Sequence, residues 1–218
     1  MNKNNLTKFK RDGKYGVIDT NGNEIVYGYD YISKFENNLA IVERDEKFGI
    51  INDKGVEIIP CIYDEISRFN SKTFRVQKNR KWFLVERSDN KVKTISNQYD
   101  YIDDVIYNNN LVKVVNKDKY GIINNKGVEI APCIYDHIGN FYDRIAKVMR
   151  EGKWGFINTK GKEFVKCIYD NVDYFDNGFA IVEKDKKYGV VNMRGKEIEP
   201  CIYDEIKNRE NYFLCSVF

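Results

Sequence analysis

The sequence contains one histidine, His137, and a cysteine, Cys133, lies four residues before it. A thiol beside an imidazole is the arrangement in which cysteine acts as a nucleophile and histidine as its base. Cys133, however, has equivalents elsewhere in the chain with no histidine near them, and a reaction does not need several copies of its nucleophile. One histidine is also too few for a histidine-rich metal site. We therefore assign no catalytic residue and expect that the protein is not an enzyme.

Four of the five cysteines begin the same tetrapeptide, Cys-Ile-Tyr-Asp. Cysteines that bind a metal must converge, typically from Cys-x-x-Cys pairs, and the sequence has no such pair. Equivalent residues of a repeat stack in a row instead of converging. We therefore predict no metal site and expect small buried hydrophobic side chains in a reducing compartment. The four residues are Cys61, Cys133, Cys167 and Cys201.

Carboxylates also recur at fixed positions, as the aspartates of six Tyr-Asp pairs and as glutamates two residues after a turn glycine. Acid–base catalysis requires two carboxylates in different environments, whereas equivalent positions of a repeat have similar surroundings. We expect these carboxylates to cap turns and to face lysines across strands. The glutamates are Glu24, Glu57, Glu129, Glu163 and Glu197. The glycines are isolated, so they form no phosphate-binding loop, and we predict no cofactor.

A lysine precedes each of six recurring aromatic positions, which would give a basic stripe if the repeats stack in phase. We expect these lysines to protect sheet edges from aggregation, with a track for a polyanion as the alternative. The regularly placed glutamates oppose a polyanion, so the sequence disfavours nucleic acid as a partner. The lysines are Lys14, Lys47, Lys81, Lys119, Lys153 and Lys187.

A repeat of about 34 residues sets all these positions. Its anchor is an aromatic residue followed by glycine, except in the third copy, where phenylalanine replaces the glycine. The anchors are Tyr15, Phe48, Trp82, Tyr120, Trp154 and Tyr188, and successive anchors are 33, 34, 38, 34 and 34 residues apart. Tyr-Asp pairs follow at Tyr29, Tyr63, Tyr99, Tyr135, Tyr169 and Tyr203. A fixed period of this length predicts units that bury their apolar faces against their neighbours.

The second copy shows the elements of one unit. Tight turns at Asp45-Glu46 and at 52–55 separate three apolar, β-branched stretches, which predict strands over 39–44, 47–51 and 56–59. We expect Pro60 to end the third strand, Tyr63 to point inward and Asp64 to bond nearby backbone. The glycine after each anchor would let a neighbouring ring lie on the backbone. We expect the anchor aromatics to fill the seams between units, so that Trp154→Ala costs about 3–5 kcal/mol.

The same strand type is predicted at both ends of the chain, over 6–11 and 213–218. A ring closed by exchanging a strand between the termini would instead divide one unit between them. The sequence therefore predicts an all-β fold of six tandem three-stranded antiparallel meanders, forming one open twisted or superhelical array over residues 1–218. A closed propeller-like ring is the alternative.

The third unit is irregular, because it lacks the anchor glycine and has a longer spacing to the next anchor. Insertions on one face of a repeat protein often mark a binding surface, although a drifted repeat is the simpler interpretation. We therefore select the aromatic residues Trp82, Tyr101 and Tyr107 as candidate binding residues.

Net charge is only +3, with lysine and arginine spread through every repeat, so composition favours neither nucleic acid nor an acidic membrane. No apolar run approaches the roughly 20 residues that span a bilayer. The polar start, Met1 to Asn5, lacks the apolar core of a signal peptide. We therefore expect no membrane insertion and a cytoplasmic location.

The stretch from Lys153 to Glu163, with the Tyr-Asp ending of each unit, resembles the bacterial WG repeat, also called the KWG repeat. The resemblance covers the chain from about Leu6 to Phe218, with tyrosine or phenylalanine at four of the six anchors. It implies a β-rich module that mediates interactions and has no catalytic residues to transfer.

These observations together predict a non-catalytic binding or scaffold module. Its main partner would be another protein, held through an extended repeat surface. The alternative is a small-ligand or glycan-binding module that uses aromatic residues between repeats as stacking platforms.

Overall fold

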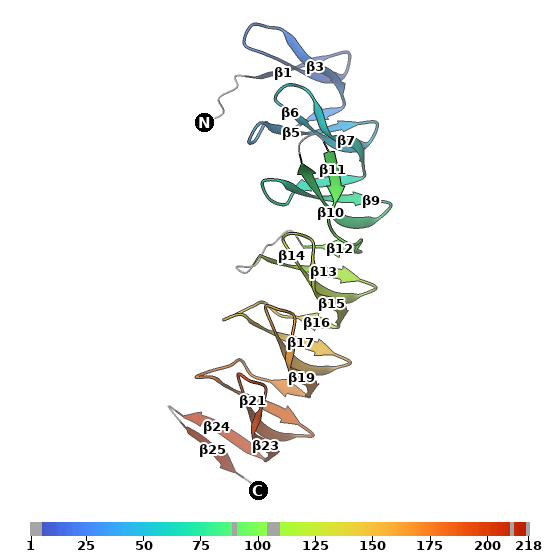
Figure 1. Ribbon diagram of the computed structural model, residues 1–218. Helices are drawn as coiled ribbons and strands as arrows, with labels where there is room; N and C mark the ends of the chain where they lie inside the picture. The colour runs from blue at the N-terminus through green and yellow to red at the C-terminus, as the bar shows by residue number, and fades with distance from the viewer. Residues whose placement is uncertain (1–5, 89–90, 104–109, 210–211, 217–218) are drawn as a thin grey trace. The chain divides into compact units, whose positions relative to one another are not determined.

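The structure, a computed structural model, describes residues 6–88, 91–103, 110–209 and 212–216 (Figure 1). Its regular elements are all β-strands, and no helix occurs in the described ranges. The chain divides into two compact halves, residues 1–102 and 103–218, each built of successive small antiparallel sheets.

The first half of the chain contains three sheets in chain order. The first sheet holds β1 (Thr7–Arg11), β2 (Lys14–Ile18) and β3 (Glu24–Tyr29). The second holds β4 (Tyr31–Ile32), β5 (Leu39–Arg44), β6 (Lys47–Asn52) and β7 (Glu57–Tyr63). The third holds β8 (Glu65–Arg68), β9 (Thr73–Lys78), β10 (Lys81–Ser88) and β11 (Lys91–Thr94). The strand β12 (Tyr101–Ile102) ends this half of the chain.

The second half of the chain repeats this plan. Its strands are β13 (Leu111–Asn116), β14 (Lys119–Asn124) and β15 (Glu129–Tyr135), then β16 (His137–Ile138), β17 (Ile145–Arg150), β18 (Lys153–Asn158) and β19 (Glu163–Tyr169). A further sheet holds β20 (Asn171–Val172), β21 (Phe179–Lys184), β22 (Lys187–Asn192) and β23 (Glu197–Tyr203), and β24 (Glu205–Arg209) pairs with β25 (Tyr212–Ser216). No sheet of the described residues closes into a barrel, and the prediction of an open tandem array of β repeats is confirmed.

Most sheets have four strands where the sequence predicted three. The additional strand is the short segment after the Tyr-Asp pair, two residues long in four copies, such as β4, which pairs with β5. The backbone N–H of Asp30 donates to Glu43 O at 2.8 Å, and that of Ser33 donates to Ile41 O at 2.8 Å. The link between units therefore satisfies its backbone groups on the next sheet.

The third strand of the second repeat is longer than predicted. β7 passes through Pro60 and continues to Tyr63, because register shifts on either side of Ile50 place Pro60 in a bulge. β7 is also the last strand of its sheet, where a residue without a backbone N–H is tolerated. Both predicted turn types occur: Asp45 and Glu46 have positive φ angles of 52° and 59°, and Gly55 N donates to Asn52 O at 3.0 Å.

The residues that fill the seams are the tyrosines of the Tyr-Asp pairs, not the anchors. Tyr29 is 1 % exposed and packs with Ile32, Val42 and Ile51 of the next sheet. The expectation that the anchors form the core is wrong for all except Trp82, since the other five are half-buried. The reason is reach: the tyrosine lies on the last strand of its sheet and extends to the following unit, where Tyr29 OH donates to Glu57 Oε1 at 2.8 Å.

The cysteines occupy matching, half-buried positions, as the phase of the repeat requires. Each anchor glycine is needed because backbone atoms of the third strand approach it closely, joined at Gly49, Gly121 and Gly189 by a cysteine sulfur. A Cβ on Gly49 would lie 2.6 Å from Ile59 O and 2.9 Å from Cys61 Sγ. The predicted aromatic ring over this glycine occurs at Gly16, beneath Phe9, whereas at Gly121 and Gly189 a cysteine sulfur takes that place.

Candidate binding site

The six lysines before the anchors are all paired, so they do not form the free basic stripe that the alternative of a polyanion track would need. Each ammonium group donates to the aspartate of its own unit's Tyr-Asp pair; for Lys47 and Asp64 the distance is 2.7 Å. The other pairs are Lys14–Asp30, Lys81–Asp100, Lys119–Asp136, Lys153–Asp170 and Lys187–Asp204. Positive charge along this row is therefore matched one to one by negative charge.

These aspartates also hold the following repeat. The second carboxylate oxygen of Asp64 accepts the backbone N–H of Asn79 at 2.8 Å, and that of Asp170 accepts Asp185 N at 2.7 Å. The expected Asx turn is therefore replaced by a clasp that joins a lysine of one unit to the hairpin of the next. The hydrogen bond from Lys153 is the main cause that lowers the pKa of Asp170.

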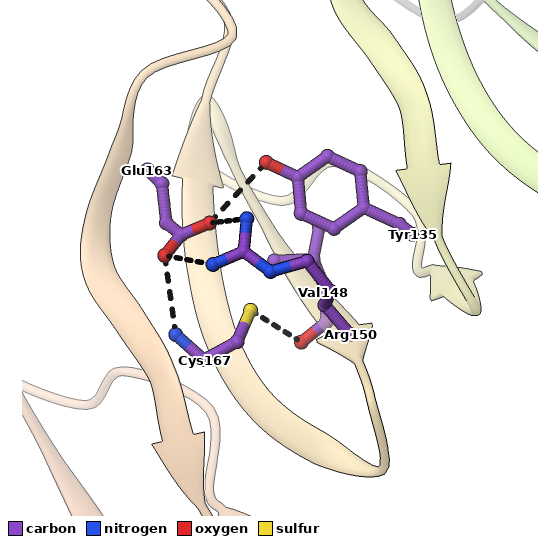
Figure 2. A network of polar contacts seen from close by, with 5 residues as sticks. All are labelled: Tyr135, Val148, Arg150, Glu163 and Cys167. Carbon is purple, nitrogen blue, oxygen red and sulfur yellow. Dashed lines mark hydrogen bonds and ion pairs between the residues drawn. The ribbon is translucent and has the colours of Figure 1, made fainter.

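A second contact between repeats is built around Glu163 (Figure 2). Its carboxylate pairs with the guanidinium of Arg150 at 3.2 Å, accepts Tyr135 OH at 3.4 Å and accepts Cys167 N at 3.2 Å. The thiol of Cys167 donates to Val148 O at 3.8 Å. The glutamates therefore bind arginine and the tyrosine of the preceding unit here, where the sequence predicted lysine partners.

The same network occurs in a second copy, around Glu57, which marks it as structural. Arg44 pairs with Glu57 at 2.8 Å, and Glu57 accepts Tyr29 OH. Burial, the largest cause, raises the pKa of both Cys61 and Cys167 to about 11. A thiol with such a pKa is protonated at neutral pH and is a poor nucleophile.

His137 is exposed on β16. Its ring lies 5.6 Å from the ring of Trp154 and 6.5 Å from that of Tyr120. Partial burial is the main cause that lowers its pKa. The described residues contain no group of three or more His, Cys, Asp or Glu that could hold a metal ion.

The candidate binding residues of the third unit have different environments. Trp82 is buried, Tyr101 is 45 % exposed, and Tyr107 lies outside the described residues. The guanidinium of Arg75 lies 4.7 Å from the Trp82 ring and 5.8 Å from the Tyr101 ring, and it donates to Ile102 O at 2.6 Å. Arg75 therefore covers part of both ring surfaces that a ligand would need.

A cleft in the second half of the chain brings together aromatic residues that the sequence analysis did not select. It has a volume of about 470 Å³ and lies between the sheet of β16 to β19 and the sheet of β20 to β23. Phe156, Phe175 and Ile145 line its apolar interior. At its mouth, Tyr142 and Tyr174 are about 60 % exposed (59 % and 61 %), and their rings meet edge to face at 5.7 Å. Figure 1 shows the strands that carry it.

Polar groups surround this apolar interior. Lys147 Nζ donates to Val172 O at 2.6 Å and lies 3.9 Å from the centre of the Tyr174 ring. Burial is the main cause that lowers the pKa of Lys147. Asp143 and Asn177 also line the cleft, in tight turns with positive φ angles of 45° and 48°.

The two tyrosines at the mouth of the cleft depart from the repeat. Tyr174 stands where other copies have Lys34, Arg68 and Asn140, and Tyr142 stands where they have Glu36, Asn70 and Asp176. Met193, also exposed in the cleft, replaces polar residues at Thr20, Asp53 and Thr159. Because the other copies fold with polar residues at these positions, the fold does not require the apolar ones. Comparison of the copies for such exceptions is the signal that would have found the cleft.

A different apolar feature follows the repeat. The isoleucine between cysteine and tyrosine points to solvent on the last strand of its sheet in four copies, with exposures from 39 % to 52 %. These residues are Ile62, Ile134, Ile168 and Ile202. In the second half of the chain, three of these isoleucines recur on consecutive sheets.

The chain has clear sequence relatives at the level of the repeat. A family model described as "WG containing repeat" matches residues 15–48, 48–82, 120–154, 154–188 and 188–213. A comparison with curated protein sequences gives no match.

Solved structures are similar only distantly. Kluyveromyces lactis Hsv2 matches with a TM-score of 0.35 and 9 % identity over 86 % of this chain and 70 % of its own. A eukaryotic initiation factor matches with a TM-score of 0.39 and 12 % identity over 88 % of this chain and 61 % of its own. Regucalcin, a calcium-binding protein from Agrobacterium tumefaciens, matches with a TM-score of 0.31 and 8 % identity over 78 % and 74 %. TM-scores this low support no conclusion about function.

In the part of the chain that the structure describes, no helix has the length and apolar character needed to cross a membrane.

Proposed function

The chain belongs to the WG repeat family, and from this premise we propose that it is a non-catalytic binding module that contacts another protein through its repeated surface. The observation that carries this proposal is the exposed isoleucine at one position of successive sheets, Ile134, Ile168 and Ile202. Large apolar side chains repeated on a protein surface are typical of interaction sites. Contacts repeated along one partner also add avidity without any single strong site.

The paired lysines support a protein partner over nucleic acid. A polyanion would have to compete with Asp30, Asp64 and their equivalents for each ammonium group. We therefore expect no salt-dependent binding of DNA or RNA.

The test compares the wild-type chain with a variant in which Ile134, Ile168 and Ile202 are all changed to serine. Because these side chains are exposed, the variant should melt near the wild-type temperature. Val128→Ser is the matched control, since Val128 is an exposed apolar residue of the same unit outside this set. Pull-down from the native host should recover a stoichiometric partner with the wild type and the control but not with the triple variant. Equal recovery by all three, or no partner with well-folded bait, contradicts the proposal.

We propose a second candidate function, the binding of a small ligand or glycan, because the aromatic cleft favours it specifically. A cleft of about 470 Å³ has the size of ordinary small-molecule sites. A thermal-shift screen of ligands against the wild type and Tyr174→Ala tests this function. A ligand that stabilises only the wild type supports it, and a screen without any such ligand counts against it.

We also propose that the protein works in a bacterial cytoplasm. The support is chemical: four half-buried cysteines are free thiols, which a reducing compartment preserves. Alkylation of thiols in intact cells, followed by fractionation, tests the location. Recovery of the protein with oxidised thiols outside the cytoplasm contradicts it.

A further inference from the structure

We propose that the cleft between Tyr142 and Tyr174 binds an uncharged pyranose ring of a glycan. This inference rests on the second candidate function above and gives its ligand a chemical class. The cleft combines a cavity of about 470 Å³ with two exposed aromatic rings.

The stacking surface comes from the two tyrosines. Their rings stand almost perpendicular, at 88°, so that they present a corner instead of a flat wall. The face of an aromatic ring carries negative potential and attracts the weakly positive C–H groups of a sugar's apolar face. Tyrosine also offers a rigid contact surface that loses little conformational entropy when a ligand binds.

The polar groups at the mouth match a ring bordered by hydroxyl groups. The Asp143 carboxylate accepts hydrogen bonds, while the Asn177 amide both donates and accepts them. A sugar hydroxyl can serve either group. The left-handed turns by themselves favour Asp and Asn at these positions, so the two rings carry the inference and the rim decides which sugars fit.

The charges of the cleft select against acidic sugars. Its one cationic group, Lys147, already donates to Val172 O and lies over the Tyr174 ring. Asp143 would repel a second carboxylate. A neutral glycan satisfies the polar groups without leaving an unpaired charge in a partly buried place.

The experiment measures binding of a neutral tetrasaccharide to the full chain. Cellotetraose and chitotetraose are the neutral probes, tetragalacturonate is the acidic comparison, and indole is the aromatic comparison. Saturation-transfer NMR and titration should show a neutral probe bound with a Kd on the order of 0.1–1 mM, the range for a small open site. Tetragalacturonate should bind at least about tenfold more weakly, because the one cation of the cleft, Lys147, already contacts Val172 O and the Tyr174 ring, and Asp143 repels a carboxylate.

Variants locate the binding. Tyr174→Ala should weaken the neutral probe by about tenfold, the contribution of one aromatic contact. Tyr174→Phe retains the ring and should stay near wild-type affinity. Tyr31→Ala, which removes an exposed tyrosine from the first half of the chain, is the matched control and should have no effect.

Three results would overturn the inference. Neutral tetrasaccharides could fail to bind, could bind equally well to Tyr174→Ala, or could bind no better than tetragalacturonate. If indole binds the wild type and not Tyr174→Ala while no sugar binds, the sugar assignment falls but the small-ligand function stands. If neither class binds, both fall.

Discussion

At the scale of single residues, the turn glycines carry more than their turns. Gly161 has a φ of +74°, and a Cβ there would overlap the carbonyl oxygen of Ile130 in the preceding unit. Gly195 is in the same situation against Phe164. The glycine thus permits both the turn and the close backbone contact that joins two units.

Replacing Gly161 by alanine should therefore be much more damaging than the same change at Gly152. Gly152 has an equally positive φ of +72°, but no atom lies within 4 Å of its added Cβ. Both variants should lose about 1–2 kcal/mol to the left-handed backbone. Gly161→Ala should lose about 1–3 kcal/mol more, because a fixed backbone oxygen cannot move aside. Urea denaturation measures both, and equal losses would contradict this account of the contact.

At the scale of the elements, sheets within each half of the chain dock on one another through the tyrosine of the last strand, such as Tyr29, Tyr63, Tyr135 and Tyr169. Tyr169 packs with Val172, Ala180 and Val182 of the following sheet. Burial is the main cause that raises its pKa to about 12, and Glu197 of the next unit adds to the effect. Trp154 lies directly opposite Tyr169 in the register but is only half-buried.

We expect Tyr169→Ala to destabilise the second half of the chain by about 3–5 kcal/mol, the range for truncating a buried aromatic residue. Trp154→Ala should cost less, about 1–2 kcal/mol, because its side chain is only partly buried. Tyr169→Phe should cost only about 1 kcal/mol, for the lost hydrogen bond. Thermal or chemical melting of the three variants checks the order. A greater loss for Trp154→Ala than for Tyr169→Ala would restore the anchors as the core.

Much of each element could be predicted from the sequence, because strands and turns depend on neighbouring residues. The turn at Asn52 follows from an Asx side chain and a glycine three residues later, and the structure has it. β4 was missed because two residues cannot show an alternating pattern. The burial of Tyr63 was predicted, but the half-burial of Phe48 was not, because it depends on which side chain reaches the next unit.

The cleft could not be predicted in the same way. Its mouth comes from three loops, near Tyr142, Tyr174 and Met193, and strands β17 and β18 complete its lining, so only the docking of two sheets brings these residues together. In one loop, an aromatic residue has no pattern that distinguishes a ligand contact from a chance exposure. The partners of the lysines were missed for a related reason, since Lys153 and Asp170 are 17 residues apart.

At the scale of the whole molecule, the aspartate clasps make stability depend on pH. The pKa values of Asp30, Asp64, Asp136 and Asp170 are all lowered, in each case chiefly by the hydrogen bond from a lysine. A carboxyl group whose pKa is lower in the folded state stabilises that state above its unfolded pKa, about 3.9. This contribution disappears as the pH falls through the folded pKa.

The melting temperature should therefore fall steeply below about pH 4 and vary little near neutrality. Asp170→Asn should lower the melting temperature at pH 7, since it removes the charge that pairs with Lys153. The difference between this variant and the wild type should shrink as the solution is acidified. A difference that stays constant down to pH 2 would show that the clasp does not titrate in this way.

The contact from each tyrosine to the next unit has a consequence for how the chain is made. Tyr29 meets Glu57 only 28 residues later, and Tyr135 meets Glu163 at the same interval. Loops this short close quickly and with little entropic penalty. A growing chain can therefore complete one sheet after another as it leaves the ribosome, in the order of synthesis and without waiting for distant segments.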